Sequence, residues 1–278
     1  IDPQWQLPSN LVIRLPVILT LITSFIVLGT ALGFHDIEIE EDQTADTNRL
    51  KGKSLLDPFR KILVAGKWTI NHRFVLFVIL ASLALDSVGR QFAVLASEYY
   101  RAIDIPVSWF GFIGAGMSLV GMVNAVFSRY LVTNHSPLFN FLTLSLILIT
   151  GLIGLGFAIP YYGVIFAVGA FAMMGMVQFQ SSYYINKEVD SIHRATVLSF
   201  KGLALNLGLG FASLLYTAYV SLLRTQQEGV LSEGVLLREA IFLDALRGFP
   251  MYFLALFFIV FFLGRILIEP RSAVLSKR

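Results

Sequence analysis

Residues 74–97 read FVLFVILASLALDSVGRQFAVLAS, an apolar run that contains two charged residues, Asp86 and Arg90. A helix of this length is about 36 Å long, enough to cross the hydrocarbon core of a bilayer, which is about 30 Å thick. Asp86 follows Phe74 by twelve residues, or about 18 Å of helix, and so falls near the middle of the membrane. The stretch predicts a transmembrane helix with ionisable groups at its centre.

The rest of the chain repeats this pattern. Of its 278 residues, 56% are apolar and 14% are charged, whereas soluble domains are about 45–50% apolar and about 25% charged. Six further apolar runs are each long enough to cross a bilayer: 11–34, 108–131, 138–157, 161–185, 197–223 and 249–268. None of the runs alternates in polarity as a barrel strand does. We therefore predict an all-α polytopic membrane protein with about seven transmembrane helices.

The basic residues predict the orientation of these helices. If the segment 35–73 is cytoplasmic, fourteen Lys and Arg residues lie on the cytoplasmic side and four on the other. This bias places the N-terminus outside and the C-terminus in the cytoplasm. The run 11–34 lacks the basic leader of a signal peptide and is too long for its apolar part, so we expect a true span.

The segment 35–73 divides the chain into an outer segment with the first helix, 1–34, a cytoplasmic linker, and a six-helix part, 74–278. Residues 36–46 of the linker carry six acids and no base, a composition typical of a solvated segment. Asp57 and Pro58 then form a helix start signal, with Asp as N-cap and Pro at the first position. The amphipathic residues that follow predict a helix that lies on the anionic leaflet or packs on the protein.

Charges in hydrocarbon are costly, so Asp86 and Arg90 are the strongest candidates for function. Their i, i+4 spacing puts both on one helical face, where they can pair. In one interpretation they face an aqueous cavity and bind substrate or carry a proton. In the other they form a structural ion pair between helices.

The other polar residues within the runs give weaker signals. Lys201 and Arg14 lie about one turn inside their helix ends, where long basic side chains snorkel to water, although Lys201 could also act in gating. Asn206 is deeper in the same run as Lys201 and is a better cavity candidate. Three further amides could make interhelical hydrogen bonds or contact substrate: Asn124, Gln178 and Gln180.

One junction between runs resembles a known family. The sequence reads Tyr-Ile-Asn at 184–186 and then Arg-Ala-Thr-Val-Leu-Ser at 194–199, where Arg194, Ala195, Thr196 and Ser199 spell a motif. This resembles the start of the eleventh helix in bacterial transporters of the major facilitator superfamily. The layout of one span, a charged loop and six spans is similar to the sixth helix, central loop and C-terminal half of that family. The family's loop signature of Gly, Asp and paired Arg is absent after the third run.

The resemblance implies an alternating-access transporter in the bacterial inner membrane, with five helices or a partner half missing from this chain. The second and fifth spans would line the cavity, which gives Asp86, Arg90, Gln178 and Asn206 as site residues, and Tyr183 could close an inner gate. The third and sixth spans would contact the other half. We expect a small solute as substrate, with protons as a possible coupling ion; an organic anion, an amino acid, a sugar and a cationic drug all stay open.

Other classes of protein fit less well. The chain has no cysteine and four dispersed histidines, and it shows no arrangement of acids or nucleophiles typical of an enzyme. We therefore expect no catalytic activity, metal, cofactor or nucleic-acid partner. A seven-helix receptor or sensor is the alternative, although the last run lacks the lysine that a retinal protein needs.

Overall fold

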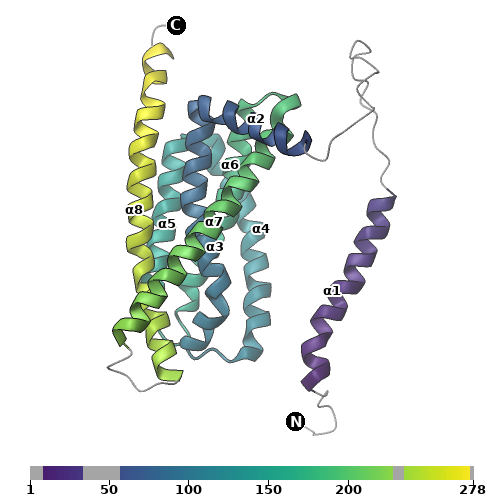
Figure 1. The fold of residues 1–278 in the computed structure, drawn as a ribbon, viewed down its shortest axis with the longest axis vertical. Coiled ribbons are helices and arrows are strands. Elements are labelled where there is room, and N and C mark those ends of the chain that lie inside the picture. Colours follow the sequence, from purple (N-terminus) through teal and green to yellow (C-terminus); the bar gives the residue numbers. More distant parts are fainter. Residues whose placement is uncertain (1–8, 34–56, 228–234, 276–278) are drawn as a thin grey trace. The chain divides into compact units, whose positions relative to one another are not determined.

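The computed structural model describes residues 9–33, 57–227 and 235–275 (Figure 1). The chain divides into two units, 1–54 and 55–278, and each is described by itself. The first unit contains α1 (Ser9–Leu32), a helix of 24 residues that covers most of the run predicted at 11–34. The acidic run at 36–46 lies outside the described residues, and so does the side chain of Arg14.

The second unit is a bundle of helices joined by short turns. Its elements are α2 (Asp57–Asn71), α3 (Arg73–Ala102), the 3-10 turn η3 (Val107–Trp109), α4 (Phe110–Asn134), α5 (Pro137–Gly156), α6 (Val164–Glu188), α7 (Ser191–Gln227) and α8 (Val235–Leu275). From α3 onward, all six α-helices are long and apolar enough to cross a membrane. The described ranges contain no strand, which confirms the all-α polytopic class.

Helix α3 is the centre of the bundle and packs against α6, α7 and α8. Most of its apolar length is buried within the unit, and Val88, Phe92 and Tyr99 have no exposed surface. Because lipid is as apolar as these side chains, close packing rather than escape from water holds such a helix among its neighbours. Residues 74–97, from which the membrane class was first predicted, therefore belong to the best-packed helix of the bundle.

Helices α4 and α7 are far less covered than α3. No residue in the most apolar window of α4 is buried, and Phe112, Leu119 and Val126 are among its exposed side chains. Helix α7 is nearly as exposed as α4, and Leu207 and Leu214 are among its exposed side chains. These two helices therefore present large apolar faces to whatever surrounds the bundle.

Helix α2 begins at Asp57, as its start signal predicts, and it packs against α7 and α3. Gly66 lies against the Phe200 ring of α7, where a Cβ would come within 2.7 Å of a ring carbon. Thr69 on the same face is fully buried, whereas Leu63 and Ile70 are exposed. The helix thus packs on the protein through one face and leaves apolar side chains exposed on the other.

Two helices begin earlier than the apolar runs predicted. Helix α7 begins at Ser191 rather than at 197, and α8 begins at Val235 rather than at 249. In the added part of α8, Leu237, Ile241 and Leu246 are buried on one face, while charged residues occupy the other. A search for continuous apolar runs misses such an amphipathic segment because its charges lower the average hydropathy.

A tight contact between α5 and α6 gives a stability prediction. A Cβ at Gly154 of α5 would overlap the Phe166 ring of α6, whereas one at Gly111 of α4 would meet no atom within 4 Å. We expect Gly154→Ala to cost about 1–3 kcal/mol by overpacking and to lower the thermal unfolding midpoint in detergent. Gly111→Ala is the matched control, and equal midpoints for the two variants would contradict the packing described here.

The predicted orientation can be tested with single cysteines, because these 278 residues contain none. Ser108 in η3 and Ser191 at the start of α7 are both exposed. Three membrane-length helices, α4, α5 and α6, separate them in the chain, so they belong to opposite ends of the bundle. In intact cells we expect a membrane-impermeant maleimide to label Ser108→Cys, and to label Ser191→Cys only after permeabilisation. The reverse labelling pattern would show that the orientation in the membrane is opposite to the predicted one.

Candidate functional site

The charged residues of α3 form an ion pair deep in the bundle. Asp86 is the fourteenth of the 30 residues of α3, and Arg90 follows one turn later. The Arg90 Nε donates to Asp86 Oδ2 over 2.5 Å, and Nη2 lies at the same distance from that oxygen. The Asp86 side chain is 1% exposed and that of Arg90 is 25% exposed. The pairing predicted from their spacing is confirmed.

The same guanidinium crosses from α3 to α7. Its Nη1 donates to Asn206 Oδ1 over 2.9 Å, and Nη2 donates to the backbone carbonyl of Leu205 over 2.7 Å. A carbonyl oxygen has two lone pairs, so this one can accept from Arg90 and still take part in the helix. Arg90 thus links the central helix to the middle of α7.

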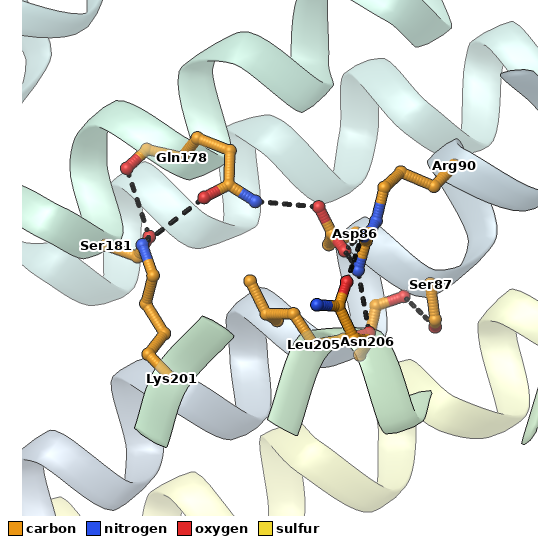
Figure 2. Close-up of polar contacts among 9 residues, drawn as sticks. Asp86, Ser87, Arg90, Gln178, Ser181, Lys201, Leu205 and Asn206 are labelled. Carbon is orange, nitrogen blue, oxygen red and sulfur yellow. Dashed lines mark hydrogen bonds and ion pairs between the residues drawn. The ribbon is translucent and has the colours of Figure 1, made fainter. Parts of the chain in front are cut away.

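The second oxygen of Asp86 binds α6. Gln178 Nε2 donates to Asp86 Oδ1 over 2.9 Å, and Gln178 Oε1 accepts from Lys201 Nζ over 3.3 Å (Figure 2). The amide therefore connects a carboxylate on α3 with an ammonium group on α7. Because each end of the amide faces a partner of fixed polarity, its orientation is determined.

Lys201 does not snorkel to the end of α7, so the default expectation for it is wrong. Its side chain is 5% exposed, and Nζ donates to Ser181 Oγ over 3.0 Å and to Ser182 Oγ over 2.9 Å. The neutral oxygens of α6 offer this ammonium group three acceptors within the bundle, and a lysine ammonium has three N–H donors.

We call these side chains the polar cluster: Asp86, Arg90, Gln178, Ser181, Ser182, Lys201 and Asn206. It brings together all four residues first named as site candidates, from three helices. Asp86 and Lys201 are sealed, whereas Gln178 and Asn206 are exposed and Arg90 is partly exposed. The cluster therefore has a buried interior and a rim that is open on one side of the bundle.

The sequence analysis missed two members of the cluster, Ser181 and Ser182, and one of its backbone partners, the Leu205 carbonyl. Ser181 and Ser182 lie one turn after Gln178, and their hydroxyls could have been noticed as a polar pair in an apolar helix. The Leu205 carbonyl has no signal in the sequence, since its role depends on the reach of Arg90. A separate hydrogen bond of 2.6 Å joins Ser213 of α7 to Gln91 of α3.

Three of the weaker candidates lie apart from the cluster's hydrogen bonds. The Asn124 amide donates to the Ala172 carbonyl over 2.8 Å and so joins α4 to α6. Gln180 is fully buried, and neither of its amide atoms has a partner among the described residues. The Tyr183 ring packs edge-on against that of Tyr184.

The residues of the family-like motif lie at the start of α7. Arg194 donates to the Val189 carbonyl over 3.4 Å, and Ser199 Oγ donates to the Ala195 carbonyl over 2.9 Å. These contacts are local to the α6–α7 junction, and Thr196 is partly exposed there. None of these contacts involves the polar cluster, although Lys201 of the cluster follows Ser199 by only two residues.

Comparison of the chain with family profiles, curated proteins and solved structures finds no match. Among the described residues, no group of three or more His, Cys, Asp or Glu side chains converges as metal ligands do.

The buried ion pair gives a prediction for stability. Arg90→Met leaves the sealed Asp86 carboxylate with Gln178 as its remaining partner, so we expect a loss of about 3 kcal/mol in the free energy of unfolding. The double variant Asp86→Leu/Arg90→Met removes both charges and should recover part of that loss. Denaturation of the purified chain by SDS measures both values.

The matched control is the exposed pair Arg101 and Glu98, also on α3, whose closest charged atoms are 3.3 Å apart. Arg101→Met should change the stability by less than about 1 kcal/mol, because water screens exposed pairs. A double variant as unstable as the sum of its single substitutions would show that Asp86 and Arg90 are not energetically coupled.

Proposed function

We propose that this chain is the C-terminal half, with one preceding helix, of a secondary transporter of the major facilitator type. It would move a small polar solute across a bacterial inner membrane by alternating access. The observation that carries the proposal is the polar cluster, which lies at mid-membrane depth and is open on one side.

The depth of the cluster argues for a solute site. Asp86, Gln178 and Asn206 are each about halfway along the predicted membrane-crossing part of their helices. Polar side chains at that depth are expensive in lipid and normally face protein or a water-filled cavity. The exposed rim of Gln178 and Asn206 therefore requires a cavity or a further protein surface beside it.

The apolar faces of α4 and α7 support a second bundle as that surface. In the arrangement implied by the family resemblance, the helices equivalent to α4 and α7 contact the other half, and those equivalent to α3 and α6 line the cavity. Helices α3 and α6 supply Asp86, Arg90 and Gln178. The second half would be further helices of a longer chain or a separate partner.

Proton coupling is part of the proposal, and Asp86 is the proposed carrier. Its two carboxylate oxygens bind Arg90 and Gln178, so a proton on one oxygen weakens the contact with α6, and a proton on the other weakens the pair with Arg90, the side chain that reaches α7. A change in the charge of one side chain would then alter how three helices are held together, which is what coupling between a proton and a conformational change needs.

Transport by the whole protein tests this proposal. We expect cells that express it to differ from cells that express Asp86→Asn in their content of at least one small solute, measured by mass spectrometry. The matched control is Asp104→Asn, an exposed aspartate with φ of 63°, a conformation that Asn also tolerates. It should behave as the wild type does.

Two outcomes separate the parts of the proposal. If wild-type and Asp86→Asn cells have the same solute content, the transporter function is wrong, and the receptor alternative must be tested by ligand binding. If a protonophore leaves the difference unchanged, transport is not driven by the proton gradient, and Asp86 acts by positioning Arg90 and Gln178.

A further inference from the structure

We infer that the solute bound by the polar cluster is an organic anion with one negative charge, such as a carboxylate. This inference rests on the proposed function, since it assumes that the cluster is the solute site. It narrows the substrate class from anions, amino acids, sugars and cations to the first of these.

The charges within the cluster do not balance. Its one carboxylate, Asp86, has both oxygens engaged, by Arg90 and by Gln178. Lys201 donates only to neutral oxygens, and among the described residues no carboxylate lies within ion-pair distance of it. With Arg90 always ionised, the cluster carries one positive charge in excess when Lys201 is protonated.

Three oxygens surround Lys201 Nζ, as many as the protonated form of this group has N–H donors. Ser181 uses its own hydroxyl hydrogen to donate to the Gln178 carbonyl over 3.2 Å, so its oxygen must accept from Nζ. The Gln178 side-chain oxygen can only accept, and with Ser182 the ammonium group has three partners, one for each of its protons. A buried charge without a counter-ion is costly, which leaves room for an anion to stabilise the site.

The exposed rim of the cluster presents donors. Asn206 Oδ1 faces the Arg90 guanidinium, so its NH2 group is the free end of an exposed amide, without a partner among the described residues. Gln178 Nε2 has a second N–H beyond the one that binds Asp86, and Arg90 Nη1 has a second N–H beyond the one that binds Asn206. The acceptor ends of both amides already face cations inside the cluster.

A rim of donors above a positive interior selects an acceptor-rich, negatively charged group. A cationic solute would meet Arg90 first, while the only carboxylate is sealed behind it at 1% exposure. A neutral sugar could accept from the same donors but would leave the excess charge in place.

Ligand binding to the purified chain in a neutral detergent tests the inference. The probes are acetate, lactate and benzoate, their amides acetamide, lactamide and benzamide, and the cations ethylamine and benzylamine, with ionic strength kept constant by chloride. We expect at least one of the anions to raise the thermal unfolding midpoint in a saturable way, and the amides and amines to leave it unchanged. No effect from any anion, or an equal effect from its amide or an amine, would overturn the inference.

Substitutions at two lysines distinguish anion binding at the polar cluster from a general effect of salt. Lys201→Met should weaken the affinity for the anion about tenfold or more, because it removes the excess positive charge behind the rim, and Lys201→Arg should keep most of the affinity. Lys187→Met, at an exposed lysine near the end of α6, should bind as the wild type does. Equal binding by Lys201→Met and Lys187→Met would show that the excess charge does not bind the anion.

The binding test and the transport test can fail independently of each other. Anion binding without any change in cellular solutes would refute transport and leave the anion site standing. Transport that depends on Asp86, together with no anion binding, would overturn the substrate class and leave the transporter standing.

Discussion

The structure depends on one constraint: a carboxylate and a guanidinium in the middle of a membrane helix must find their partners inside the protein. Asp86 and Arg90 satisfy each other first and then take further partners from α6 and α7. Lipid offers no hydrogen bonds at this depth, so each of these bonds replaces one that solvent would supply elsewhere. As a result, the helix that carries the charges is also the one most completely surrounded by its neighbours.

The fold class could be predicted because length and hydropathy act through local properties of the chain. An apolar run of twenty residues is a membrane helix whatever it packs against, and the i, i+4 spacing of Asp86 and Arg90 predicts their pairing from helix geometry alone. The early part of α8 was missed because Leu237 and Ile241 are apolar on one face only. Its burial depends on neighbours that no scan along the chain includes.

Most residues of the site could be predicted from the sequence, but the hydrogen bonds that connect them could not. Charge or depth in the membrane identified Asp86, Arg90 and Asn206, and the family resemblance added Gln178 by its place in a cavity-lining span; the structure brings the four together. The same reasoning gave the wrong direction for Lys201, because a long side chain near a helix end can turn either way. The serines of α6 decide its direction, and their effect depends on how α6 and α7 pack.

The two side-chain amides of the cluster give its hydrogen bonds a direction. From donor to acceptor, the path leads from Lys201 through Gln178 to Asp86, and from Arg90 both to Asp86 and outward to Asn206. Asp86 only accepts hydrogen bonds, so this carboxylate sets the orientation of the Gln178 amide. Arg90 in turn sets the orientation of the Asn206 amide. The donor that Gln178 presents on the open side is therefore set by Asp86, which the solute cannot reach, whereas the donor of Asn206 is set by the partly exposed Arg90.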